Sequence, residues 1–107
     1  MAKLFVLSRP VSAEREDDYN KWYDEVHLAE VCAVEGIVAA QRFVAAAEQP
    51  VGEAPSPYIA IYEFEGDCQA ALAAMLEASA TFDMGDSIDL TQTQAFLMLE
   101  HGERFEP

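Results

Sequence analysis

Basic residues are scarce in this chain of 107 residues. Six lysines and arginines stand against twenty aspartates and glutamates, which gives a net charge of −14. A surface this negative repels phosphate backbones and anionic lipid headgroups, so we expect neither a nucleic-acid partner nor a membrane partner. A small apolar or neutral ligand meets no such barrier.

Cysteine and histidine are also scarce, with two of each. Cys32 and Cys68 lack the spacing of metal ligands, and we interpret them as small buried apolar side chains. His27 and His101 are far apart and belong to no cluster of potential ligands, so we expect no metal site. A glycine-rich phosphate loop, a nucleophile elbow and a dinucleotide-binding fingerprint are absent as well, and we expect no cofactor.

Long apolar runs are missing. None approaches the roughly 20 residues that a membrane-spanning helix needs. The first apolar run is too short for a secretory signal, and we interpret it as a strand. We therefore expect a single cytoplasmic domain over residues 1–107, large enough to bury a modest core.

The remaining sequence alternates between patterns typical of strands and of helices. Apolar and β-branched runs bounded by proline or glycine predict four strands, over residues 3–9, 37–47, 58–65 and 91–101. Capping signals and apolar spacing predict two helices, over residues 12–34 and 68–80. We expect Ser12 and Asp67 to be their N-caps.

Two further expectations concern packing. The inner face of the second helix should carry Ala71, Leu72, Met75 and Leu76. Residues 81–90 read as an irregular connection, which should pack its apolar side chains inward: Phe82, Met84 and Ile88.

This β-α-β-β-α-β order predicts a ferredoxin-like α+β domain, with a four-stranded antiparallel sheet and two helices on one face. The strands are apolar on both sides, as in residues 5–7, 58–62 and 95–99, whereas one chain supplies helices for only one face. A second copy would cover the other face. We therefore expect a homodimer that packs sheet against sheet.

The densest group of chemically versatile side chains lies in the first predicted helix. At 3.6 residues per turn, one helix face carries Tyr19, Trp22, Tyr23, Val26, His27, Glu30 and Val34. Aromatic and aliphatic residues at this spacing are ordinary core residues. An inward imidazole and an inward carboxylate are not, and they favour a pocket beneath the helix.

Three short motifs follow one another in this region: Trp22-x4-His27, Glu35-Gly36, and Arg42-Phe43 on the next predicted strand. Together with the element order they resemble the EthD-like branch of the dimeric α+β barrel superfamily, whose members commonly have Pro-Gly at the second motif. The resemblance implies sheet-to-sheet dimers with a ligand pocket between helices and sheet in each subunit. The superfamily includes cyclases, isomerases and monooxygenating enzymes, so the reaction stays open.

His27 is the predicted general acid–base residue, because the ordinary pKa of histidine lets it accept or donate a proton near neutrality. Asp24 or Glu30 would orient its ring, and Tyr23 would act as a paired acid or hydrogen-bond donor. The alternative is a structural histidine that is hydrogen-bonded to a loop.

The predicted substrate-binding residues are polar or aromatic side chains on the first predicted helix and on the predicted strands: Tyr19, Trp22, Glu30, Arg42, Tyr62 and His101. Arg42 would clamp a substrate oxygen, pair with Glu30, or form a salt bridge at the dimer interface. The aromatic residues are equally consistent with a core, and His101 with a solvated strand end.

The sequence therefore favours a small cofactor-independent enzyme of the cyclase, isomerase or lyase type. It would move a proton on an apolar or aromatic-like carbonyl metabolite. Two alternatives remain open. One is a non-catalytic dimer that binds a hydrophobic metabolite for another enzyme, and the other is a purely structural dimer without a cavity.

Overall fold

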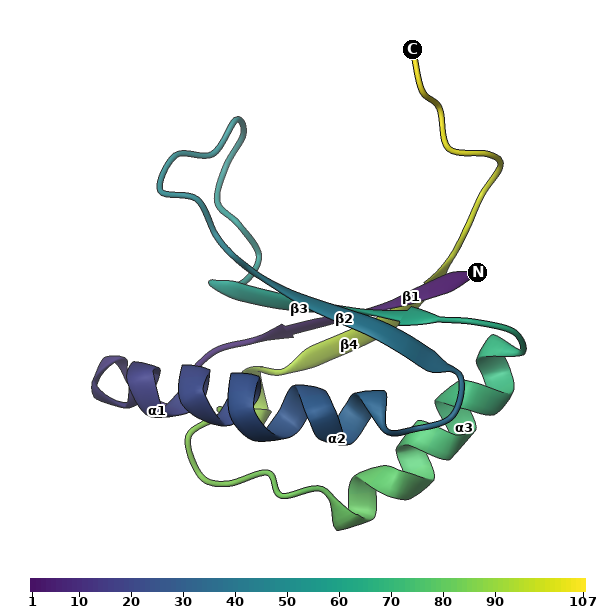
Figure 1. The fold of residues 1–107 in the computed structure, drawn as a ribbon. Helices are drawn as coiled ribbons and strands as arrows, with labels where there is room; N and C mark the ends of the chain where they lie inside the picture. Colours follow the sequence, from purple (N-terminus) through teal and green to yellow (C-terminus); the bar gives the residue numbers. More distant parts are fainter.

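One antiparallel sheet organises the chain, and the computed structural model describes all of residues 1–107. Its strands are β1 (Ala2–Ser8), β2 (Ile37–Val44), β3 (Tyr58–Phe64) and β4 (Gln94–Leu99). They lie in the order β2-β3-β1-β4, and the helices lie on one face only (Figure 1). The predicted ferredoxin-like α+β arrangement is confirmed. The predicted second and fourth strands were too long, because β2 ends at Val44 and β4 spans only Gln94–Leu99.

The first helical region follows β1 and has a composite structure. A 3-10 turn, η1 (Ala13–Arg15), leads into α1 (Glu16–Trp22), then a π-helical segment η2 (Tyr23–His27), then α2 (Leu28–Cys32). Ser12 precedes the first turn as expected, but its side chain makes no capping hydrogen bond. That part of the prediction was wrong, because the chain enters through a 3-10 turn instead of a regular α-helical turn.

The π segment changes which residues face the sheet. Tyr19, Tyr23, His27 and Val31 are all buried, four residues apart. In an uninterrupted α-helix the positions of Tyr19 and Val31 would differ by about 120° around the axis. The wider π turn removes much of this difference, so these four residues share one buried face, and the predicted Val34 is partly buried and packs against the core beyond it.

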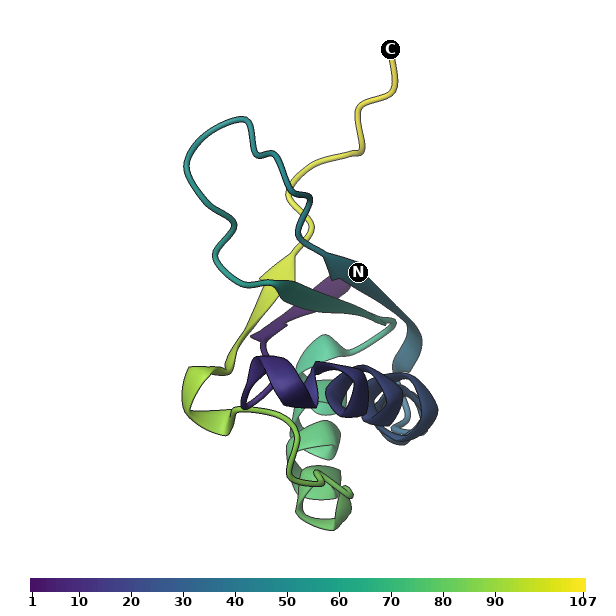
Figure 2. The ribbon, with the colours of Figure 1, turned by 90° about the vertical axis from the view of Figure 1, so that its left-hand side faces the viewer.

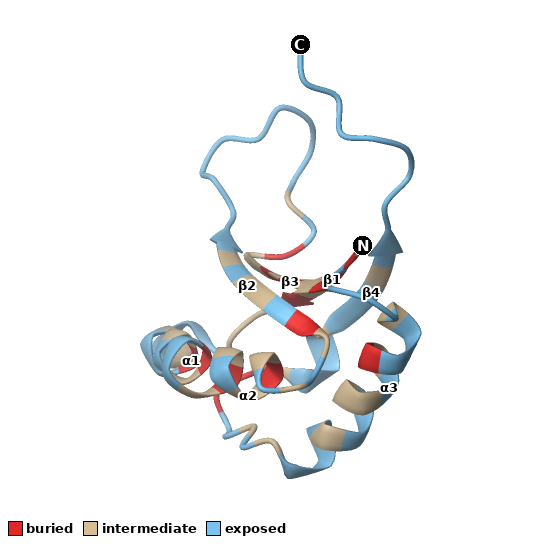
Figure 3. Cartoon of the chain, turned by 45° about the vertical axis from the view of Figure 1, so that its right-hand side comes forward, coloured by how far each residue is buried: buried red, intermediate tan, exposed pale blue.

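The second helix, α3 (Cys68–Ala78), begins as predicted. The Asp67 side chain accepts a hydrogen bond from the Ala70 N–H at 3.1 Å. Ala71 is buried against the sheet end, but Leu76 is 61% exposed, so its predicted inward orientation is wrong. The reason is that α3 leaves the sheet as it proceeds, and its second half projects away from the core (Figures 1 and 3).

The turn before β2 passes close to α3. Gly36 has φ +94°, and a Cβ atom there would lie 2.8 Å from Ala71 Cβ. Glycine is therefore required by both backbone conformation and space. This contact fixes the start of α3 against the end of the first helical region.

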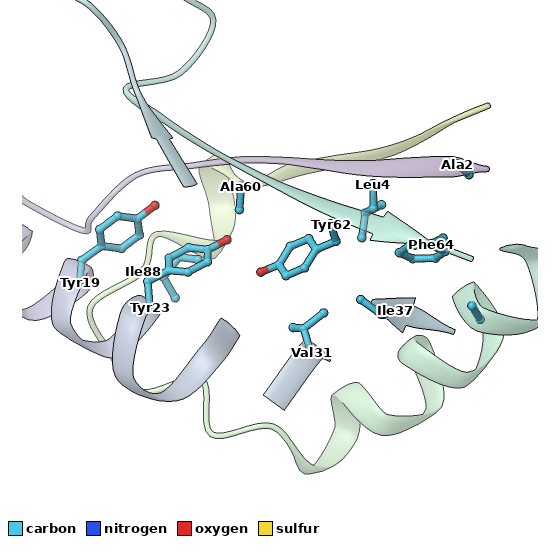
Figure 4. Close-up of a cluster of buried hydrophobic side chains, with 11 residues drawn as sticks. Ala2, Leu4, Tyr19, Tyr23, Val31, Ile37, Ala60, Tyr62, Phe64 and Ile88 are labelled. Atoms are coloured by element: carbon cyan, nitrogen blue, oxygen red, sulfur yellow. The ribbon is translucent and has the colours of Figure 1, made fainter. Parts of the chain in front are cut away.

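The core lies between the sheet and the first helical region. Figure 4 shows buried side chains from the sheet and from that helical region facing each other across this layer, including Tyr23 and Tyr62. The connection after α3 adds Ile88, which is buried, and Phe82 and Met84, which pack against the core. Their predicted inward packing is confirmed. Cys32 and Cys68 are half-buried free thiols.

The opposite face of the sheet carries no helix (Figure 2). Strand alternation puts mainly apolar residues on it: Phe5, Leu7, Phe43, Ile59, Ile61, Phe96 and Met98. The rings of Phe5 and Phe96 are stacked with centroids 5.5 Å apart. On the two central strands of this face, Lys3 Nζ of β1 lies 3.8 Å from Glu63 Oε1 of β3. No helix in the molecule has the length and apolar character to cross a lipid bilayer.

Candidate functional site around His27

His27 ends the π segment and lies among three aromatic rings. Its ring stacks on Trp22 with centroids 4.6 Å apart, and it meets Tyr23 and Phe82 edge-on at 5.2 and 5.7 Å. The stacking of Trp22 on His27, five residues later, follows from the π turn, whose hydrogen bonds join residues five apart. The Trp22-x4-His27 motif is thus the sequence of this turn. His27 is only 9% exposed.

The polar side of His27 faces Glu30. His27 Nδ1 lies 3.8 Å from Glu30 Oε1, and neither atom has a hydrogen-bond partner. Burial lowers the pKa of His27, and the nearby Glu30 carboxylate opposes this effect only in part. The imidazole is therefore neutral at pH 7 and able to accept a proton.

Glu30 and Trp22 also hold the connection between α3 and β4. The Asp83 N–H donates to Glu30 Oε2 at 2.8 Å, and Trp22 Nε1 donates to the Asp83 carbonyl at 2.7 Å. Phe82, next to Asp83, covers the edge of the His27 ring. We call residues 82–89 the covering segment, because they close the site on the side away from the sheet (Figure 1).

Arg42 lies beside this site on β2, with other partners than expected. It donates to Asp24 Oδ1 at 2.9 Å and to Asn20 Oδ1 at 2.8 Å. The predicted Glu30–Arg42 ion pair is therefore wrong, as is the predicted role of Asp24 in orienting His27. Arg42 reaches the α1 side of the helical region, whereas Glu30 lies beyond the π turn and contacts the covering segment.

The Arg42 guanidinium also lies over three aromatic rings. Its Cζ is 4.4 Å from the centroid of Tyr23, 5.1 Å from that of Tyr58 and 5.4 Å from that of Tyr19. Such contacts stabilise the cation electrostatically. Arg42 thus links β2 to the first helical region within one chain.

Two tyrosine hydroxyls in the layer beneath the helix lack hydrogen bonds. Tyr23 and Tyr62 are each 1% exposed, and their hydroxyls point toward one another (Figure 4) without a hydrogen bond to any group. Burial raises the pKa of both, so both remain protonated at neutral pH. Tyr19 differs, because its hydroxyl lies 2.5 Å from Ser8 Oγ.

The structure brings most of the predicted site residues together. Trp22, Tyr23, His27 and Glu30 lie on consecutive turns of one helical region, with Tyr62 across the layer on β3. His101 is separate, because it follows β4 and is exposed on the tail that rises from the other face of the sheet (Figure 1).

Among the predicted site residues, only Arg42 lines one of the main surface cavities. This cleft of about 420 Å³ also has Asn20, Asp24 and Tyr58 in its wall. His27 is enclosed instead by the rings around it. No group of three His, Cys, Asp or Glu side chains is placed to hold a metal ion.

Sequence reasoning missed the part that Asp83 plays in this site. Its contact is made through backbone atoms, 53 residues from Glu30, so no side-chain pattern indicates it. Phe82 was predicted only as a core residue. A tryptophan N–H and a carboxylate on one helix face were the only available signal, since both need a partner when covered.

Comparisons with solved structures find the same fold at low sequence identity. An EthD-family protein from Bacillus halodurans C-125 matches with a TM-score of 0.62 and 16% identity, over 94% of this chain and 99% of that one. HapK from Hahella chejuensis matches with a TM-score of 0.57 and 14% identity, over 99% of this chain and all of that one. This chain has an EthD-like fold.

The EthD-like fold covers almost the whole chain, as the element order predicted. No protein-family model matches the sequence, and no curated protein matches it either. The likeness therefore describes architecture, and the chemistry has to be argued from the side chains of this chain.

Proposed function

We propose that this EthD-like protein is a small enzyme that moves a proton on an apolar or aromatic-like carbonyl compound without a cofactor. One observation supports the proposal above all. Four buried polar atoms without hydrogen-bond partners belong to neighbouring residues: Tyr23 Oη, His27 Nδ1, Glu30 Oε1 and Tyr62 Oη. Each such atom costs about 1–3 kcal/mol of stability, and a bound ligand with polar groups would offset this cost.

The protonation states suit the abstraction of a proton next to a carbonyl group. Neutral His27 would accept the proton from carbon, and the Glu30 carboxylate would stabilise the resulting imidazolium. Tyr23 and Tyr62 would donate hydrogen bonds to the carbonyl oxygen as negative charge develops there. His27 would then return the proton to a second atom, which completes an isomerisation, a cyclisation or an elimination.

The surroundings support an apolar, flat substrate. The rings of Trp22, Tyr23 and Phe82 border His27, and they offer aromatic faces and edges to a ligand. Access would require the covering segment to move, because Phe82 closes the site. Its two hydrogen bonds to Trp22 and Glu30 would have to break as the substrate enters.

The test uses simple carbonyl compounds in place of the natural substrate. Aromatic ketones and lactones are incubated with the protein in D2O, and NMR follows the loss of signal from the proton next to the carbonyl. We expect exchange with the unchanged protein and a decrease of at least about 100-fold in the His27→Gln variant.

The controls separate chemistry from folding. Glu30→Gln keeps the imidazole but removes the charge beside it, and it should slow exchange about tenfold or more. Glu25→Gln is the matched control, because Glu25 is exposed on the same π segment and should leave exchange unchanged. Undiminished exchange in a folded His27→Gln protein would contradict the proposed role of His27.

A second candidate is a protein that binds the same class of ligand without a reaction. The enclosure of His27 by Trp22, Tyr23 and Phe82 favours it, because an enclosed aromatic site holds a ligand whether or not a proton moves. In that case ligand binding would broaden NMR signals or release heat, but no compound would lose its proton to D2O.

We also propose that two copies associate through their uncovered sheet faces. Support comes from the apolar residues on that face and from its charge. Lys3 and Glu63 are its only charged residues, and they form an ion pair in a molecule of net charge −14. The face is thus electrically neutral, and two copies can approach there with little local repulsion. Sedimentation velocity over a range of concentrations tests this directly.

A further inference from the structure

Two segments rise from the uncovered sheet face at its opposite ends (Figures 1 and 2). One is the β2–β3 connection, residues 45–57, and the other is the tail after β4, residues 100–107. The helices lie on the other face. Both segments therefore flank the surface against which a second copy would pack.

The β2–β3 connection holds an open cleft of about 440 Å³. Seven of its twelve lining residues are hydrophobic, and they include Phe43, Val44, Val51 and Ile59. Val44 is 68% exposed and Val51 is 88% exposed. An apolar side chain that entered this cleft would remove these surfaces from water and stabilise the assembly.

The tail carries one large apolar side chain and one base. Phe105 is 86% exposed, and Arg104 makes an ion pair with the neighbouring Glu106 at 3.4 Å. The tail stands away from the rest of its own chain (Figure 1). An exposed phenylalanine beside an arginine on such an arm has the composition of an interface anchor, in which aromatic residues and arginine are enriched.

One two-fold arrangement of the proposed dimer would bring the two segments together. A half-turn about an axis parallel to the sheet, and perpendicular to the line from connection to tail, exchanges the two ends of the molecule. The tail of one copy then meets the connection of the other. Eight extended residues reach about 26 Å, well beyond the roughly 10 Å that separates packed sheets.

The size of the sheet face suggests that the two segments contribute to the dimer interface. Four strands of about seven residues give a flat area of roughly 440 Å². A stable interface buries about 800 Å² on each partner. Arms that exchange between copies would add to the accessible surface that the two sheet faces bury.

We propose that Phe105 of each copy packs into the cleft of the β2–β3 connection of the other copy. The inference rests on the homodimer proposed above. One contact could favour the pairing: Arg104, next to Phe105, would exchange its ion pair with Glu106 for one with Glu53 in the cleft wall. The occupant of the cleft is therefore a second copy of this chain.

Engineered disulfides test the pairing in the full chain. Cys32→Ser and Cys68→Ser remove the native thiols, and Phe105→Cys and Val51→Cys are added singly and together. Copper–phenanthroline serves as the oxidant. We expect the variant with both added thiols to form a covalent dimer in which position 105 of one copy is bonded to position 51 of the other, identified by mass spectrometry of the linked peptides.

The outcomes are distinguishable. The protein could sediment as a dimer and yet form no disulfide between positions 105 and 51. This result would overturn the tail docking but not the proposed dimer. Efficient cross-linking of Phe105→Cys alone would show that tails pair with tails, and it would overturn the proposal too. A protein that stays monomeric at all concentrations would overturn both the dimer and the docking.

A measurement without cross-links completes the test. Phe105→Ala should weaken dimerisation about tenfold to a hundredfold, whereas Phe105→Leu keeps an apolar side chain and should weaken it much less. Phe105 is exposed on the tail, so its replacement leaves the core of the fold untouched, and circular dichroism checks this. Equal affinity in all three proteins would contradict the proposal.

Discussion

Arg42 is the residue that ties the edge strand of the sheet to the first helical region. Its side chain is only 12% exposed, while its partner Asp24 is 61% exposed. The guanidinium bonds Asp24 and Asn20 with two different nitrogens and covers the Tyr23 ring. Few side chains can make these two hydrogen bonds and the aromatic contact together, because the three contacts need a planar group with several hydrogen-bond donors.

Arg42→Lys should therefore lower the free energy of unfolding by about 1–2 kcal/mol, measured by urea denaturation, although the charge is kept. Asp24→Asn is the comparison. Its carboxylate is largely in water, so we expect a loss below about 1 kcal/mol. A larger loss for Asp24→Asn than for Arg42→Lys would mean that the exposed ion pair, and not the aromatic contact, stabilises this link.

His27 predicts how stability depends on pH. Its pKa is lowered in the folded protein, so the unfolded chain binds a proton more readily as pH falls below 6.5. Stability from this group is present above pH 6.5 and is lost as pH falls toward the folded pKa. We expect the free energy of unfolding to decrease from about pH 7 to about pH 5, and His27→Gln to reduce that decrease. Identical slopes in the two proteins would show that other groups dominate.

At the scale of elements, the π segment and the covering segment form one unit. The π turn presents Trp22 and Glu30 to the same backbone unit, Asp83, from both sides of His27. Short π-helical segments within α-helices are frequent at functional sites, because they change the direction of side chains that an α-helix would place elsewhere.

Trp22→Phe keeps a ring over His27 but removes the N–H that bonds the Asp83 carbonyl. We expect the amide protons of the covering segment to exchange with solvent faster by about fivefold, since one hydrogen bond contributes about 1 kcal/mol. Amides of β1 and β3 serve as the internal reference and should not change. Unaltered exchange at Asp83 would show that Glu30 alone holds the segment.

Element order, strand faces and the Asp67 cap could be predicted from the sequence, because they depend on local patterns of polarity and capping chemistry. The π turn could not, since no local preference marks it and an α-helical periodicity was assumed. An α-helical periodicity wrongly favours an ion pair between Glu30 and Arg42. It also hid the contact with Asp83, which depends on tertiary packing between distant residues.

For the whole molecule, charge opposes association. Each copy carries −14, and two copies in contact repel each other even though the sheet face is neutral. Raising NaCl from about 0.1 M to about 1 M shortens the screening length from about 10 Å to about 3 Å. The dissociation constant of the proposed dimer should fall accordingly in sedimentation equilibrium. A rise would mean that attraction between opposite charges holds the two copies together.

Trp22 is the chain's only tryptophan, and its indole lies flat against an imidazole that can titrate. Protonated imidazoles quench indole fluorescence, so the emission of the unlabelled protein reports the charge on His27. All of the indole emission comes from Trp22. A ligand that displaced Phe82 or shifted Asp83 would change both the wavelength and the intensity of this emission. The intrinsic fluorescence of Trp22 can therefore be used to follow events at the proposed site.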